Sequence, residues 1–164
     1  EVSRAGSRLR LRFRLTADLG RLRIPPPAAA QFTLGLWEHT CFEAFVAAAA
    51  GDVPYHEINL SPSGEWAAFA FARYREIASL DVERCAPRIR SAAAAALELD
   101  AEVDLAALAP ATAAGPLHLG LAAVVEEASG ALSYWALRHP AEKADFHHPG
   151  ARALHLPAPE RGDA

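Results

Sequence analysis

The sequence predicts an all-β fold, an antiparallel β-sandwich with at most a short helix. Residues 8–15 (RLRLRFRL) and 97–105 (LELDAEVDL) alternate strictly between apolar and charged side chains, which is the period of a strand with one buried face. Turn residues separate further apolar runs of strand length, as at 51–54 (GDVP), 61–64 (SPSG) and 128–130 (ASG). Many short strands joined by such turns are typical of a sandwich.

The expected strands follow one another along the chain. They are the segments 8–15, 42–47, 55–60, 65–74, 97–105, 117–127 and 131–139, the last two forming a hairpin. A proline-rich surface connection is expected at 24–31. In residues 76–96, where Pro87 disfavours a helix, we expect a loop with at most one helical turn. Residues 1–156 then form one domain, and residues 157–164 a disordered tail.

Two charged rows accompany the two alternating strands. Arginines occupy every outward position of residues 8–15, and acidic residues occupy those of residues 97–105. If the two strands are neighbours, these side chains can pair across the sheet. We therefore expect a solvated face, with an anion site on the arginine row as the alternative.

The composition disfavours several classes of protein. The chain has 164 residues and a formal net charge of -4, whereas nucleic-acid-binding domains are usually basic. No apolar run of about 18 residues is present and no signal peptide is visible, so we expect no membrane span and a cytoplasmic location. Since the sequence starts at Glu1 and contains no Met, a cleaved leader stays open. Cys41 and Cys85 lack framework spacing and are expected to be reduced thiols, with a single disulfide as the alternative.

Histidines provide the candidate metal ligands. His39, Cys41 and Glu43 alternate, so on a strand they would share one face, but structural zinc sites usually draw four ligands in recognisable pairs. His147 and His148 are adjacent and would point to opposite faces of a strand. Ordinary sheet packing is favoured for the first group, loop closure for the second, and no metal is expected.

Catalytic patterns are scarce in this sequence. The segment 61–66 (SPSGEW) is no nucleophile elbow, and no glycine-rich loop opens a helix. Glu43 and Glu57 could face each other on paired strands, where a structural or ligand-binding role is favoured over acid–base catalysis. We therefore expect a protein that is not an enzyme and has no catalytic residues.

Three tryptophans indicate a binding site more directly. Trp37, Trp66 and Trp135 each lie at a strand end beside polar residues. Small-ligand sites combine aromatic walls with a few placed polar groups, and such rings can stack on a sugar or a porphyrin. Packing in the sandwich core is the alternative for each of them.

Three long segments resemble the bacterial DOMON-like domains, which belong with the DOMON and family 9 carbohydrate-binding-module superfamily. The segments are 36–47 (LWEHTCFEAFVA), 55–71 (YHEINLSPSGEWAAFAF) and 130–149 (GALSYWALRHPAEKADFHHP). They occur in the family's order, and the resemblance extends over residues 9–156. Two departures stand out: Ala144 replaces the usual proline of Lys-Pro-Asp-Phe-His, and residues 150–154 (GARAL) replace the expected acid and phenylalanine.

The resemblance implies an immunoglobulin-like or jelly-roll sandwich that binds a ligand. Members bind sugars between aromatic rings or hold haem. We expect carbohydrate binding, with haem as the alternative cofactor, ligated by two of His39, His56, His139 and His147 because the chain contains no Met. A protein-interaction module without a small ligand, or a dimer through a sheet edge, is the further alternative.

The expected site is a single concave surface with Phe146 in the core beneath it. Tryptophans would stack on the sugar, and polar side chains would bond its hydroxyls. The residues are Trp135, Trp66, Trp37, Glu57, Asn59, His139, Lys143, Asp145 and His147.

Overall fold

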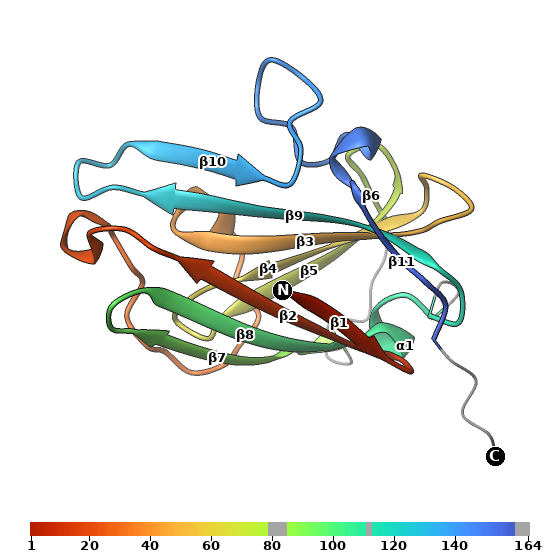
Figure 1. Cartoon of the computed structure of the whole chain (residues 1–164), viewed down its shortest axis with the longest axis horizontal. Helices are drawn as coiled ribbons and strands as arrows, with labels where there is room; N and C mark the ends of the chain where they lie inside the picture. Colours follow the sequence, from red (N-terminus) through yellow and green to blue (C-terminus); the bar gives the residue numbers. More distant parts are fainter. Residues whose placement is uncertain (79–84, 111–112, 160–164) are drawn as a thin grey trace.

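The computed structural model describes residues 1–78, 85–110 and 113–159, and it confirms the all-β sandwich. Two antiparallel sheets pack face to face (Figure 1). The four-stranded sheet has the order β1 (Val2–Ala5), β2 (Arg8–Leu15), β8 (Leu97–Asp104) and β7 (Arg88–Ala93). The seven-stranded sheet has the order β10 (Leu132–Ala136), β9 (Leu117–Glu126), β3 (Cys41–Ala48), β4 (Tyr55–Leu60), β5 (Trp66–Arg73) and β6 (Glu76–Ala78), and β11 (Leu154–Leu156) also pairs with β9.

Alternation along each strand divides the side chains between the core and an outward face. In β3, Phe42, Ala44 and Val46 belong to the main core between the sheets. The odd-numbered Phe45 and Ala47 instead form a smaller apolar cluster with Tyr55 of β4 and Phe71 of β5. The seven-stranded sheet is therefore buried on both faces over β3 and β4, and its second face carries the pocket described below.

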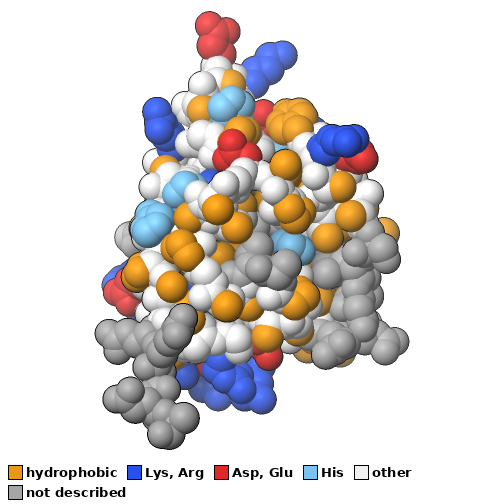
Figure 2. Space-filling model, turned by 90° about the vertical axis from the view of Figure 1, so that its right-hand side faces the viewer, with side chains coloured by type: hydrophobic (Ala, Val, Ile, Leu, Met, Phe, Trp, Pro, Cys, Tyr) orange, Lys and Arg blue, Asp and Glu red, His pale blue; other side chains and the backbone are white. Residues whose placement is uncertain are grey.

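The charged rows of β2 and β8 pair across the four-stranded sheet as the alternation indicates. Each arginine of β2 lies opposite an acidic residue of β8, from Arg8 opposite Asp104 to Arg14 opposite Glu98. Arg12 Nε lies 2.6 Å from Asp100 Oδ1, and Arg8 and Arg10 both contact Glu102, at 2.7 and 3.1 Å. Figure 2 shows Lys and Arg side chains gathered at the lower end of the molecule, on the side of this sheet.

The expected loop at 76–96 is corrected where the structure describes it. Residues 76–78 and 88–93 are the edge strands β6 and β7, while residues 79–84 lie outside the described residues. Arg88 and Arg90 of β7 lie opposite Glu102 and Asp100 of β8, so the basic–acidic pattern continues across the edge. The short helix α1 (Leu105–Leu108) follows β8 instead, where the Asp104 carboxylate accepts from the Ala106 amide at 2.9 Å and caps it.

Short 3₁₀ turns connect several strands, at η1 (Leu19–Arg21), η2 (Leu36–Glu38) and η4 (Pro149–Ala151). None of the helices in the described part of the chain combines the length and apolar character that a membrane span requires. Both cysteines are buried thiols, and Cys85 Sγ lies 3.6 Å from the carbonyl oxygen of Ala107. Of the expected tail, residues 157–159 are described and belong to no strand; the remainder lies outside the described residues.

Candidate functional site

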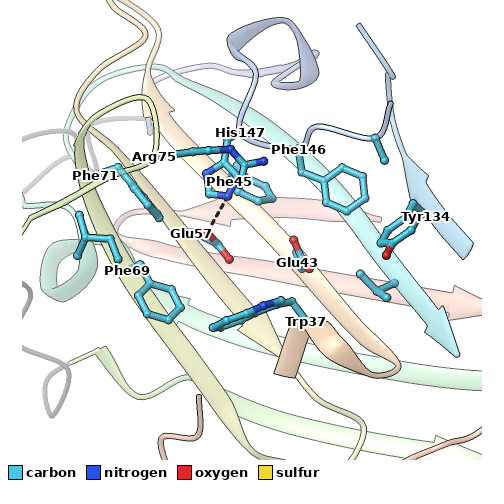
Figure 3. Close-up of a pocket in the computed structure, with 13 residues that line it drawn as sticks. Trp37, Glu43, Phe45, Glu57, Phe69, Phe71, Arg75, Tyr134, Phe146 and His147 are labelled. Carbon is cyan, nitrogen blue, oxygen red and sulfur yellow. Dashed lines mark ion pairs between the residues drawn. The ribbon is translucent and has the colours of Figure 1, made fainter. Parts of the chain in front are cut away.

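A pocket of about 420 Å³ lies on the outward face of the seven-stranded sheet. Side chains at odd positions of β3, β4 and β5 form its floor, and the loop after β10 and the turn before β6 form its rim (Figure 3). The lining residues are Trp37, Glu43, Phe45, Glu57, Phe69, Phe71, Arg75, Ile77, Val124, Tyr134, Ala144, Phe146 and His147. Its volume falls within the range of about 300–1,000 Å³ that small-molecule sites usually have.

Aromatic rings form the walls of this pocket. Trp37 meets the edge of Phe69 at a centroid distance of 5.8 Å, and Phe69 in turn contacts Phe71 at 6.4 Å. On the opposite side, Phe146 lies 6.3 Å from Tyr134 and 6.4 Å from Phe45. Figure 3 shows Trp37 and Phe69 on one side of two carboxyl groups and Phe146 and His147 on the other.

Trp37 is presented to the pocket by a local turn. Gly35 has φ 80°, a conformation that glycine adopts without strain, and it opens the 3₁₀ turn η2. Within that turn, Leu36 is buried against Cys41 and Ala67, whereas Trp37 keeps 39% of its surface exposed. One buried neighbour therefore anchors the turn while the indole stays accessible at the mouth of the pocket.

Two buried carboxyl groups lie on the floor between these walls. Glu43 is 3% exposed and Glu57 is 6% exposed. In the β3–β4 register Glu43 lies opposite Asn59 and Phe45 lies opposite Glu57, so the two acids are diagonal neighbours on one face. Asn59 donates a 2.7 Å hydrogen bond to Glu57 Oε1. Among the described residues, Glu43 has no hydrogen-bond partner for its carboxyl group.

Burial shifts the protonation of both acids. Loss of solvent, followed by repulsion from Glu57, raises the pKa of Glu43 to about 8. Burial also raises the pKa of Glu57, which the hydrogen bond from Asn59 and the charge of Arg75 partly offset. At neutral pH Glu43 is therefore mostly protonated, and a carboxylic acid can both donate and accept a hydrogen bond.

His147 is a neutral donor above Glu57. The Tyr55 hydroxyl accepts the backbone N–H of Arg75 at 3.0 Å and lies 3.0 Å from His147 Nδ1. We assign the hydroxyl proton to the bond with Nδ1, because this hydroxyl already accepts from Arg75; in that tautomer the ring proton is on Nε2, 3.6 Å from Glu57 Oε2. Burial and the charge of Arg75 lower the pKa of His147 to about 4, so the ring is uncharged at neutral pH. The 3.6 Å distance exceeds a direct hydrogen bond, so the Nε2 N–H can donate to a ligand atom and Glu57 Oε2 can accept from one.

The rim is held together by Asp145. It accepts the Tyr74 hydroxyl at 2.8 Å and the Arg75 guanidinium at 3.1 Å, and it also accepts the backbone N–H of His147 at 3.2 Å. These contacts join the loop after β10 to the turn between β5 and β6. Arg75 forms an ion pair with Asp145 beside the pocket. Burial acts to raise the pKa of Asp145, but the hydrogen bonds from Tyr74 and Arg75 outweigh it and the pKa is lowered.

The structure brings together five of the nine expected site residues. Trp37, Glu57 and His147 line the pocket. Asn59 lies behind them, fully buried, and orients Glu57, and Asp145 fixes the rim.

Two expected stacking residues lie elsewhere, which corrects the expectation of one site holding all nine. Trp66 is at an even-numbered position of β5, and these positions face the core between the sheets. It is 5% exposed, and its ring contacts Phe32 edge-on. Trp135 lies opposite Ala123 on β9, and its neighbour Tyr134 takes the pocket side. The indole of Trp135 is 62% exposed and lines a separate shallow groove beside Phe13.

His139 and Lys143 are likewise separate from the pocket lining. Both lie on the loop after β10 with exposed side chains, and His139 contacts only the far side of Phe146, at a ring distance of 6.1 Å. Phe146 itself is half-buried on the outward cluster with Phe45, so its expected place in the sandwich core is corrected.

Sequence reasoning left several pocket residues out of the site. Phe69 and Phe71 alternate with alanines in the segment 67–72 (AAFAFA), a signal for two rings on one strand face. Phe45 follows Glu43 with the same spacing. Arg75 and Tyr134 carried no comparable signal, because their placement depends on a turn and on strand register.

The geometry does not assemble the metal or haem sites considered from the sequence. His39 lies before β3 begins and its Nδ1 is 2.8 Å from Glu126, so it does not share a face with Cys41 and Glu43. Within the residues described, no three His, Cys, Asp or Glu side chains are grouped to hold a metal ion. Of the expected haem ligands, His147 lines the pocket. His56 is at an even-numbered position of β4, the side that faces the core, and His139 is exposed on its loop. Of the four histidines considered as haem ligands, His147 alone lines the pocket.

Comparisons of this chain with family models, with curated proteins and with solved structures found no match.

Proposed function

We propose that this chain is a DOMON-like, non-catalytic binding domain that holds a small carbohydrate in the pocket of Trp37, Glu43, Glu57 and His147. One observation carries the proposal: an accessible indole stands at the mouth of a pocket whose buried floor holds polar groups with unused hydrogen-bonding capacity. A sugar ring presents the matching surfaces, an apolar face of C–H groups and a rim of hydroxyls.

The polar groups are complementary to hydroxyls. Glu57 Oε2 accepts, His147 Nε2 donates, and protonated Glu43 does both. Two of these side chains are held in place by hydrogen bonds, Glu57 by Asn59 and His147 by Tyr55, so they lose little side-chain entropy when a ligand binds.

A binding role is favoured over catalysis by how these groups are engaged. Asn59 occupies Glu57 Oε1, and the Tyr55 hydroxyl occupies His147 Nδ1, so each group offers one atom to a ligand. We place the protein in the cytoplasm within the same proposal, because the two cysteines lack the spacing of a disulfide framework.

Tryptophan fluorescence tests the proposal. The protein is titrated with a panel of mono- and disaccharides, alongside the variants Trp37→Phe and Trp135→Phe. We expect a saturable change in fluorescence with one class of sugar. The change should persist in Trp135→Phe and disappear in Trp37→Phe, because Trp37 lines the pocket and Trp135 does not. Affinity measured by calorimetry should fall at least tenfold in Trp37→Ala, and mass spectrometry should recover the sugar unchanged.

A flat response across the panel, from protein whose circular dichroism shows an intact fold, would contradict carbohydrate binding. An equal loss of signal in both phenylalanine variants would contradict the assignment of the site to Trp37.

A further inference from the structure

Glu43 and Glu57 are two buried acids on the floor of one pocket, and no cation of the described residues lies between them in an ion pair with Glu43. Glu43 is almost fully buried, faces the pocket, and has no hydrogen-bond partner among the residues described. Buried polar groups are nearly always hydrogen-bonded, and buried carboxylates are nearly always paired with a cation. Among the described residues, the fully enclosed side-chain atoms without a partner are His56 Nδ1 and Arg152 Nε, so the Glu43 oxygens stay open to the pocket, where a donor group of the ligand can meet them.

The cations of the described residues do not fill this position. Arg75 lines the pocket, but its guanidinium is engaged by Asp145 at 3.1 Å. His147 is neutral, and its Nε2 faces Glu57. The remaining polar lining is the Tyr134 hydroxyl and the Trp37 indole N–H, and the titratable neighbour of Glu43 on its own strand is the buried Cys41 thiol. The floor is therefore acidic and its walls are aromatic, both of which attract positive charge.

We propose that the ligand is an amino sugar with a free amine, whose ammonium group lies between the carboxyl groups of Glu43 and Glu57 while its ring stacks on Trp37. This inference rests on the proposed function. An ammonium has three N–H donors, and Glu43 offers two free oxygens and Glu57 one. The faces of the surrounding rings complete a cage for a cation.

N-acetylated and neutral sugars provide the contrast. Acetylation removes the positive charge and two of the three donors, and it adds bulk on the floor of the pocket. Hydrogen bonds between charged groups are roughly twice as strong as neutral ones. Glucosamine should therefore bind at least about tenfold more tightly than glucose or N-acetylglucosamine at pH 7.

Binding of the ammonium is coupled to loss of a proton from Glu43. In the free protein Glu43 is mostly protonated at pH 7, since its pKa is about 8. A cation beside it favours the carboxylate, so part of a proton is released on binding and affinity rises from pH 6 towards 8, until the ligand's amine deprotonates. The titratable groups that face Glu43 are Glu57, Arg75, Tyr134, His147 and Cys41.

Calorimetry in buffers of different ionisation enthalpy tests this inference. The probes are glucosamine, N-acetylglucosamine, glucose and cyclohexylamine, a ring amine without hydroxyls. The variants are Glu43→Gln, which keeps the shape and removes the charge, and Glu98→Gln, which makes the same change on the exposed face of the other sheet. We expect tighter glucosamine binding with proton release in the wild type and in Glu98→Gln, and neither effect in Glu43→Gln.

The outcomes separate this inference from the proposed function. Equal affinity for glucosamine, glucose and N-acetylglucosamine would overturn the ammonium site and leave carbohydrate binding intact. If cyclohexylamine binds and none of the sugars does, carbohydrate binding would be overturned and the ammonium site supported. No binding of any probe would overturn both. Proton release in the wild-type protein supports the inference even if Glu43→Gln fails to fold.

Discussion

The outward faces of the two sheets both carry acidic side chains, which are hydrated and paired with arginines on one sheet and buried on the other. On the four-stranded sheet, Asp100 and Glu102 are exposed or half-exposed and each is paired with arginines of β2. On the seven-stranded sheet, Glu43 and Glu57 are buried beside each other and no cation of the described residues is paired directly with Glu43. Charge density alone therefore does not distinguish the two faces; burial and the lack of a cationic partner for Glu43 among the described residues do.

The comparison also explains why the two faces differ energetically. Exposed pairs gain little because water screens them and both side chains lose freedom when they pair. A buried carboxyl keeps the full penalty of lost solvation unless a hydrogen bond or a cation offsets it. The following changes test that difference, from the largest expected effect to the smallest.

Asn59→Ala should have the largest effect. The substitution removes the 2.7 Å hydrogen bond to Glu57 and leaves the carboxyl unsatisfied in a buried position. We expect the free energy of unfolding to fall by about 2–3 kcal/mol, and by more at pH 8 than at pH 5 because the lost donor stabilised the ionised form. Urea unfolding followed by circular dichroism at both pH values measures this. A loss below about 0.5 kcal/mol at pH 8 would show that Glu57 does not depend on Asn59.

A pH dependence of stability should follow from Glu43. Its folded pKa, about 8, is above the value of 4.5 for a free glutamate, so the folded state binds more protons and stability falls as pH rises between these values. His147 acts in the opposite direction up to about pH 6.5, because its pKa in the folded state is about 4. Above pH 6.5 His147 no longer contributes, and Glu43 still does. We therefore expect the free energy of unfolding to fall by about 2 kcal/mol between pH 6.5 and pH 8.

The variant Glu43→Gln isolates that contribution. Unfolding free energies from pH 6.5 to 8 should become nearly independent of pH in this variant, whereas Glu98→Gln should keep the wild-type slope. A slope that persists in Glu43→Gln would assign the pH dependence to another group.

Glu102→Gln should have the smallest effect. Its carboxylate contacts Arg8 and Arg10 on the solvated face, and these contacts lower the pKa of Glu102. Because both partners stay hydrated when the charge is removed, the thermal midpoint should change by no more than the error of the measurement. A marked loss of stability would show that the arginine row is a structural network after all.

The strands with strict alternation could be predicted from sequence, and the site only in part. In the segment 8–15 the charged positions identify the outward face and the apolar positions the inward face. Its pairing with residues 97–104 follows from the row of arginines on one strand and the row of acidic residues on the other. Residues 88–93 were missed because an exposed edge strand rich in alanine has little apolar alternation to detect. The sequence also does not reveal which face of β10 the pocket occupies, so Tyr134 lines the pocket in place of the expected Trp135.

Glu57, His147 and Trp37 were predictable for different reasons. Glu57 and Asn59 share a face of a short apolar strand, where buried polar residues are conspicuous. His147 and Trp37 are in segments on which the family resemblance rests. Glu43 attracted attention in the sequence as a neighbour of Cys41, but its lack of a partner emerges only once the strands are packed.

The indole N–H signals of the three tryptophans test the central claim most directly. Trp37 lies at the pocket, Trp66 in the core and Trp135 on the opposite face of β10, so each reports on a different environment. A ¹H–¹⁵N spectrum, assigned with single Trp→Phe variants, is recorded with increasing glucosamine. The account predicts that the Trp37 signal moves and saturates while the Trp135 signal stays in place. Movement of Trp135 alone, or no movement at saturating ligand, would contradict it.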